Sequence, residues 1–170
     1  MNVESEISHI EREKYFSGPV EVVCDPRMKA HCLDPYHAHP KGCPNWNYKQ
    51  GCPPNVPYFT DVYSKDVYIA AFRFNFAEYL AEKKIKHPDW TDRALRNPRH
   101  WQAHVRSDFR RFLAEELPKR QDIQGDVLFS PEAMGVNLFA TCQKAGIFLE
   151  HTPTNFVYNI ALIASPNLLK

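Results

Sequence analysis

The residues of this 170-residue chain best suited to chemistry are four cysteines near the amino terminus, Cys24, Cys32, Cys43 and Cys52. They are separated by seven, ten and eight intervening residues. The stretch from 31 to 54 also holds three of the eight histidines and five of the fourteen prolines. It shows neither alternation nor helical periodicity, which indicates a long polar loop. Such a loop buries little apolar surface, so we expect a metal, disulfides or a partner to hold it.

The cellular setting favours a metal over disulfides. The opening residues, MNVESEISHIEREKYF, carry acids and no continuous apolar run, so they indicate neither a secretory signal nor a transit peptide. No run approaches the roughly 18 apolar residues of a membrane span. We therefore expect a cytoplasmic protein that does not enter a membrane. In a reducing cytosol, clustered cysteines with an odd total of five are typical of metal ligands or reactive thiols.

The spacing of the cysteines bears on which metal they bind. Structural zinc sites commonly use pairs of cysteines two to four residues apart, and no such pair exists here. An iron–sulfur cluster can take ligands from a wrapped loop, because its corners point in different directions. The Cys43-Pro44 and Cys52-Pro53 steps are also typical of ferredoxin-like loops. The pattern favours an iron–sulfur cluster, with a 4Fe-4S cluster first and zinc as the alternative cofactor.

Other side chains of the loop are candidates for supporting roles. His37 and His39 could ligate zinc or some iron centres, although a His-x-His in a polar loop is more often solvated. His31 adjoins a cysteine and could hydrogen-bond a sulfur or replace one as a ligand. Trp46 and Tyr48 are expected to shield the site from water, which would tune a redox potential.

The rest of the chain offers few signatures of chemistry. Cys142, a lone thiol within the last predicted helix, is expected to be a small buried residue rather than a remote ligand. Arg99, Arg106 and Arg110 share one face of a predicted helix, which is more often a solvated face than a phosphate or partner site. A net charge of +1 makes nucleic-acid binding an unfavoured alternative. The sequence holds no glycine-rich phosphate loop, nucleophile elbow or His-Glu-x-x-His helix, so whether it is an enzyme stays open.

Two motifs resemble a known family. The stretch CPNWNYKQGCPPN resembles the cysteine signature of small prokaryotic cysteine-rich proteins described as predicted metal-binding proteins, a domain of unknown function. The later stretch SPEAMGVNLFATCQKAGIFLE resembles the second block of that family, a helix with a Glu-Ala-Met-Gly opening. The likeness runs in order from about residue 22 to residue 164, most of the chain.

The resemblance implies coordination of a metal by cysteines, with Cys32, Cys43 and Cys52 as the best-matched ligands and Cys24 as a fourth ligand or a bystander. The chain departs from the family by the extra residues DPYHAHPK, and it lacks further cysteines before the second block. It is therefore expected to hold at most one cluster. The implied function is an accessory, maturation or redox module for a partner enzyme. The alternative is a zinc-stabilised protein-interaction domain without catalysis.

The elements that must position this loop follow from periodicity and capping residues. We predict strands over 18–24, 65–74, 126–129 and 155–164, the second of them buried on both faces. Three helices are predicted between them: over 75–84; from Asn97 as N-cap to a stop at Pro118; and from Ser130 as N-cap to Gly146.

This alternation predicts a single domain over 1–170, either α/β or α+β, with a central sheet flanked by helices. Residues 1–17 are expected to form an amino-terminal extension, and residues 24–54 the long metal-binding cysteine loop.

Overall fold

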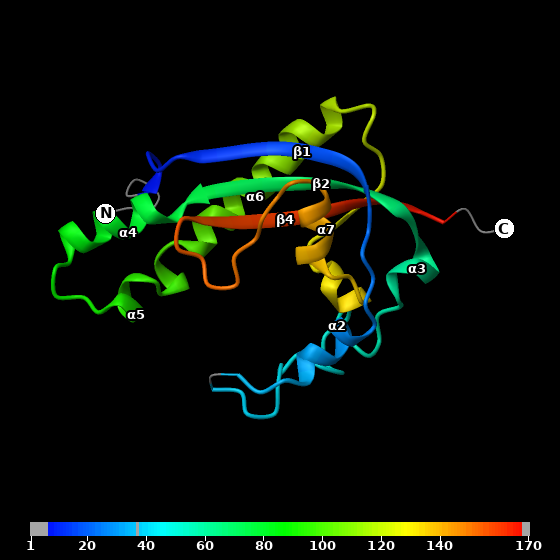
Figure 1. Ribbon diagram of the computed structural model, residues 1–170, viewed down its shortest axis with the longest axis horizontal. Helices are drawn as coiled ribbons and strands as arrows, with labels where there is room; N and C mark the ends of the chain where they lie inside the picture. Colours follow the sequence, from blue (N-terminus) through cyan, green and yellow to red (C-terminus); the bar gives the residue numbers. More distant parts are fainter. Residues whose placement is uncertain (1–6, 37, 168–170) are drawn as a thin grey trace. The chain divides into compact units, whose positions relative to one another are not determined.

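A computed structural model of the protein describes residues 7–36 and 38–167 (Figure 1). The chain divides into two compact units. Unit 1 comprises Met1–Phe16, Ala70–Asp122 and Leu149–Ile160, and unit 2 comprises Ser17–Ile69, Ile123–Phe148 and Ala161–Lys170. All four cysteines of the amino-terminal region belong to unit 2. Within the described residues, no helix is both long enough and apolar enough to span a membrane.

The described strands form one antiparallel sheet of four strands in the order β1-β2-β4-β3. These strands are β1 (Arg12–Glu21), β2 (Tyr63–Asn75), β3 (Asp126–Leu128) and β4 (Phe156–Pro166). Because the pairing is antiparallel, the fold class is α+β, one of the two expected classes.

The predicted central strand is confirmed as β2. Its residues Ile69, Ala70, Ala71 and Phe72 are all fully buried, which is what a strand covered on both faces requires. The first strand begins at Arg12, six residues before its predicted start, so part of the expected extension is strand. The residues REKYF at its start show no alternation, three charged residues being followed by two aromatic ones, so the pattern did not indicate a strand there.

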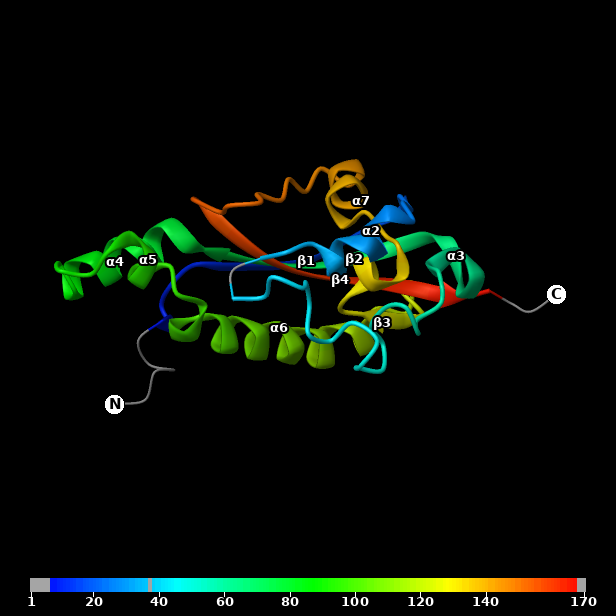
Figure 2. The ribbon, with the colours of Figure 1, turned by 90° about the horizontal axis from the view of Figure 1, so that it is seen from below.

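Unit 1 is built around α6 (Gln102–Glu116), which lies along its strands (Figure 2). The predicted apolar face is confirmed, since Trp101, Val105, Phe109 and Phe112 are all buried. Phe112 stacks on Phe16 at 5.0 Å between ring centroids. The arginines expected on the solvated face are exposed: Arg99, Arg106 and Arg110.

The helix α6 begins later than predicted. Asn97 does cap, by accepting from the Arg99 N–H at 3.1 Å, but it caps a separate turn, η2 (Pro98–His100). The chain then leaves helical geometry at Trp101, whose φ is −145° and whose indole is buried. At the other end, Pro118 lies in the turn η3 (Leu117–Lys119), so the predicted stop is confirmed.

The other helices of unit 1 are α4 (Phe76–Lys86) and α5 (Asp92–Leu95). The predicted helix over 75–84 is confirmed as α4, with Asn75 accepting from the Glu78 N–H at 3.1 Å. Tyr79 of α4 is 1% exposed, which anchors this helix in the aromatic core of unit 1.

Unit 2 contains α2 (Arg27–Ala30), η1 (His31–Leu33), α3 (Phe59–Val62), η4 (Pro131–Met134) and α7 (Leu138–Lys144). Its short strand β3 pairs with β4 in the register Val127 to Ile163. The Tyr63 hydroxyl donates to Asp126 at 2.9 Å, which fastens the start of β2 beside β3. Unit 2 also includes residues 24–58, which contain Cys24, Cys32, Cys43 and Cys52 and are called the cysteine segment below.

The predicted helix from Ser130 to Gly146 is wrong, because the chain forms two elements there. Ser130 makes no side-chain cap, and the turn η4 ends at Gly135, whose φ of 85° is left-handed. A new helix, α7, starts after Asn137, whose side chain accepts from the Ala140 N–H at 3.0 Å. A glycine at positive φ followed by an N-capping asparagine ends one helical element and starts another.

Candidate metal centre

The start of the cysteine segment pairs with the residues between η4 and α7. Cys24 and Val136 form an isolated antiparallel bridge. On either side of it, the Asp25 N–H donates to the Gly135 carbonyl at 2.7 Å, and the Asn137 N–H donates to the Val23 carbonyl at 2.8 Å. The structure thus positions the entry to the segment by backbone pairing.

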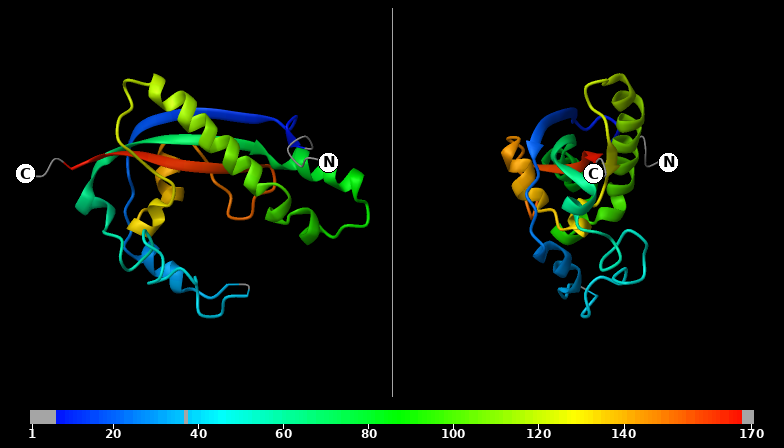
Figure 3. Two further views of the ribbon diagram at one scale, coloured as in Figure 1. Left: turned by 180° about the vertical axis from the view of Figure 1, so that it is seen from behind. Right: turned by 90° about the vertical axis from the view of Figure 1, so that its right-hand side faces the viewer.

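The return of the segment is tied to α2 by one lysine. The Lys29 ammonium donates to the Val56 carbonyl at 2.6 Å and lies 3.9 Å from the centre of the Tyr58 ring. A cation over an aromatic face stabilises the contact further. The segment therefore starts and ends at neighbouring points of unit 2, as Figure 3 shows. Between residues 34 and 58 its described part consists of turns, without a helix or strand element.

Cys32 and Cys43 are brought together by a direct backbone contact. The Cys43 N–H donates to the Cys32 carbonyl at 2.7 Å. The contact depends on Gly42, which is buried with a φ of 83°. A Cβ at Gly42 would lie 2.6 Å from the Cys32 carbonyl oxygen and 2.7 Å from the Leu33 carbonyl carbon. Only glycine allows two backbone segments to approach this closely here.

Cys52 is linked to the same region by short hydrogen-bonded turns. The Trp46 N–H donates to the Cys43 carbonyl at 3.1 Å, and the Asn47 N–H donates to the Pro53 carbonyl at 2.8 Å. The Cys52 N–H donates to the Lys49 carbonyl at 3.0 Å. The chain therefore folds back on itself between Cys43 and Cys52.

The pKa of the Cys32 thiol is raised by its surroundings. Burial is the largest cause, and negative charge at Cys43, Cys52 and Glu132 adds to it. Cys32, Cys43 and Cys52 are each half-buried, and none is in a disulfide. Backbone hydrogen bonds thus link Cys32 to Cys43 directly, and Cys43 to Cys52 through short turns.

The thiols of Cys32, Cys43 and Cys52 do not form a metal-binding arrangement in the structure. Within residues 7–36 and 38–167, no set of three or more His, Cys, Asp or Glu side chains is arranged so that it could hold a metal ion.

Cys24 stands apart from this group. It is exposed, and it lines a separate cavity of about 330 Å³ together with residues that include Tyr58, Asp61 and Met134. Burial raises the pKa of its thiol, and Lys65 opposes that rise. None of the other cysteines contributes to this shift. Cys24 thus lies at the bridge to Val136 and beside this cavity.

The loop residues expected in supporting roles are placed differently from one another. The His31 imidazole is exposed and pairs through Nδ1 with Asp34 at 2.6 Å. His39 is half-buried and its ring lies against that of Tyr36, 4.7 Å between centroids. His37 lies outside the described residues.

The two aromatic residues expected to shield the site also differ. Trp46 is half-buried. Tyr48 is 91% exposed, so the expectation that it excludes water from the sulfurs is wrong.

Sequence reasoning missed Glu132. It lies on η4, which packs against α2, and burial raises the pKa of its carboxyl group. Its charge also contributes to raising the pKa of Cys142 to about 12, although burial is the larger cause. Cys142 itself is fully buried, as expected. The only signal for Glu132 was its place in the Glu-Ala-Met-Gly block, where it looked like an ordinary acid in the first turn of a helix.

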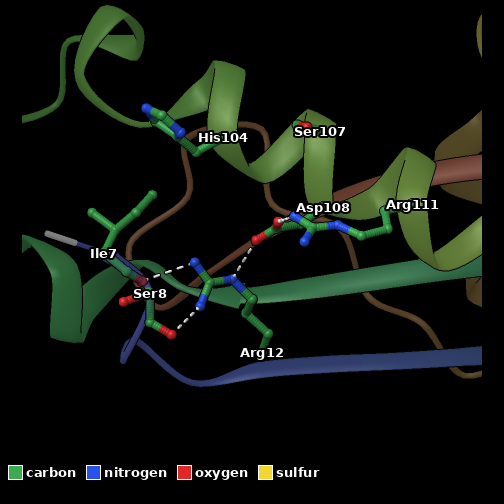
Figure 4. A pocket seen from close by; sticks show the side chains of 7 residues that line it. All are labelled: Ile7, Ser8, Arg12, His104, Ser107, Asp108 and Arg111. Atoms are coloured by element: carbon green, nitrogen blue, oxygen red, sulfur yellow. Dashed lines mark hydrogen bonds and ion pairs between the residues drawn. The ribbon is translucent and has the colours of Figure 1, made fainter. Parts of the chain in front are cut away.

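Another cavity, lined mostly by polar side chains, lies in unit 1 beside Arg12 (Figure 4). It measures about 270 Å³, and His104 and Ser107 also line it. The Arg12 guanidinium donates to the Ser8 carbonyl at 2.8 Å and pairs with Asp108 at 3.0 Å. Asp108 also pairs with Arg111. Arg12 and Asp108 are thus already paired with groups of the chain itself. The cavity is best explained as the place where these pairs hold the start of β1 against α6.

Comparison of the chain with protein families, with curated proteins and with solved structures found no match.

Proposed function

We propose that the protein binds one metal centre through Cys32, Cys43 and Cys52 and serves as an accessory, maturation or redox module for a partner enzyme. The observation that supports the proposal is that a 2.7 Å backbone bond joins Cys43 to Cys32 and that short hydrogen-bonded turns lead from Cys43 to Cys52, with none of the three in a disulfide. A segment of turns costs conformational entropy to order, and sulfur–metal bonds would offset that cost.

The donor chemistry favours an iron–sulfur cluster. The three cysteines come from separate turns rather than from one tight knuckle, which suits the corners of a cluster better than a single zinc ion. Because metal binding requires thiolates, a raised pKa at Cys32 means that binding would release a proton there. Three cysteine ligands would leave one iron of a 4Fe-4S cluster open to another donor.

Analysis of the metal in anaerobically purified protein tests this function. We expect a brown protein with iron and sulfide in equal amounts, about four of each per chain for a 4Fe-4S cluster. A colourless protein with one zinc would instead favour the zinc-stabilised interaction domain. Protein that takes up neither zinc nor iron and sulfide would contradict the metal site altogether. Aerobic purification is unsuitable, because zinc can occupy cysteine sites that have lost a cluster.

A further inference from the structure

The chain between Cys32 and Cys43 forms a small hydrogen-bonded loop in unit 2. At the base of the loop, the Cys43 N–H donates to the Cys32 carbonyl at 2.7 Å. Further out, Tyr36 and His39 form an antiparallel bridge, in which the Tyr36 N–H donates to the His39 carbonyl at 3.2 Å and the His39 N–H donates back at 2.8 Å. The backbone therefore closes this loop at two levels and holds its first and last residues together.

The bond at the base of the loop limits the distance between the two cysteines. With standard bond lengths, a carbonyl oxygen lies about 2.4 Å from its own Cα, and an amide nitrogen lies about 1.5 Å from its own Cα. A 2.7 Å hydrogen bond thus keeps the Cα atoms of Cys32 and Cys43 within about 6.5 Å of each other. Disulfides join cysteines whose Cα atoms are about 4.4–6.8 Å apart. The backbone therefore places this pair within the range of a disulfide bond.

The other cysteines have no comparable contact with this pair. In the described part of the chain, no backbone hydrogen bond joins Cys52 directly to Cys32 or Cys43. Cys24 forms its bridge with Val136 instead, and Cys142 is fully buried. Cys32 and Cys43 are free thiols and only half-buried, so a small reagent in solution can reach them.

We propose that Cys32 and Cys43 form a reversible disulfide by exchange with a small-molecule disulfide, and that this bond switches off metal binding by the cysteine segment. One of the two cysteines, as its thiolate, attacks a sulfur of the small disulfide and releases one small thiolate. The other cysteine then attacks the protein sulfur of this mixed disulfide and releases the second. The two protein thiols are oxidised, the small disulfide is reduced to two thiols, and the two cysteine protons pass to these through water.

The disulfide and the metal exclude each other. Metal ligation needs thiolates, so a disulfide between Cys32 and Cys43 removes two of the three proposed ligands. A metal bound to the same sulfurs would in turn prevent their attack on a small disulfide. The switch therefore rests on the proposed metal site, whereas the disulfide itself depends only on the loop.

Peptide mapping of the metal-free, reduced chain after exposure to oxidised glutathione tests the disulfide. Trypsin cleaves after Lys29, Lys41 and Lys49, so it places Cys32 and Cys43 on the separate peptides 30–41 and 42–49. We expect these two peptides to be joined in the unreduced digest, with two of the five thiols lost. Cys52→Ser is the control and should give the same joined pair.

The same reaction in concentrated urea shows whether the folded loop selects the pair. Seven, ten and eight residues separate the four neighbouring cysteines, so in an unfolded chain the joined pair should make up about a third of the products or less. In the folded chain it should dominate. Glutathione adducts alone, links mainly to Cys24 or Cys52, or equal product mixtures with and without urea would overturn the disulfide.

Zinc titration of the reduced and the oxidised chain tests the switch. Oxidation should weaken zinc binding by at least about a hundredfold, more than the loss of an outer partner of a ligand usually costs, and a reducing agent should restore it. Equal zinc binding by both forms would overturn the switch. A reduced chain that binds neither zinc nor an iron–sulfur cluster would overturn the proposed metal site and with it the switch, while leaving the disulfide to the mapping experiment.

Discussion

Replacing Gly42 by alanine will uncouple Cys32 from Cys43 and reduce metal affinity by about tenfold or more. The new Cβ would lie 2.6 Å from the Cys32 carbonyl oxygen and 2.8 Å from the Leu33 Cα, and backbone atoms cannot turn aside as a flexible side chain can. To remove this clash, the backbone at Gly42 must move away from the backbone at Cys32, which breaks the 2.7 Å hydrogen bond from the Cys43 N–H to the Cys32 carbonyl. Metal content after anaerobic reconstitution measures the effect.

Gly51→Ala is the matched control for this prediction. Gly51 has a φ of 86°, close to the 83° of Gly42, so alanine suffers similar backbone strain at both positions. A Cβ at Gly51 meets no atom within 4 Å, whereas one at Gly42 meets backbone. Gly51→Ala should thus keep most of its metal. Equal losses in the two variants would mean that general loosening of the segment, rather than contact between Cys32 and Cys43, governs binding.

The largest effect on folding stability is expected at Phe109. Its ring lies on the buried face of α6, 6.1 Å from that of Phe72 and 3% exposed. Phe109→Ala removes this buried ring and leaves a cavity among aromatic neighbours, which should lower the free energy of unfolding by about 3–5 kcal/mol. Denaturant unfolding followed by circular dichroism measures the loss.

Arg106→Ala provides the comparison on the same helix. Arg106 is exposed, so its removal should change stability by no more than about 0.5 kcal/mol. A small effect at Phe109, similar to that at Arg106, would contradict the assignment of the buried face of α6.

The sequence predicted best those elements whose burial follows a regular period. The continuous apolar run of β2 and the buried stripe of α6 were both identified, because a long periodic segment has few alternative ways to bury its apolar side chains. The start of β1 was missed, because its first residues, three charged and then two aromatic, do not alternate as a half-buried strand does. The wrong helix over 130–146 had a readable signal in the sequence Gly135-Val136-Asn137, a helix end followed by a new cap.

The candidate site could be predicted in composition but not in arrangement. The types and number of cysteines indicated metal chemistry, and the resemblance favoured Cys32, Cys43 and Cys52. The spacing could not show that the Cys43 N–H bonds to the Cys32 carbonyl, or that Cys24 pairs with Val136, more than a hundred residues away. Contacts of this kind depend on tertiary packing, which local spacing in a sequence does not encode.

Both ends of the cysteine segment are held by the chain itself, by the backbone bridge between Cys24 and Val136 and by the hydrogen bond from Lys29 to the Val56 carbonyl.

Metal retention by single cysteine-to-serine variants, prepared and analysed anaerobically, tests the central claim most directly. Serine keeps the size of the side chain but supplies a poor ligand for soft metals. We expect Cys32→Ser, Cys43→Ser and Cys52→Ser each to lose the bound metal, and Cys24→Ser and Cys142→Ser to keep it. Full retention in any of the first three, or loss confined to Cys24→Ser, would contradict a centre shared by Cys32, Cys43 and Cys52.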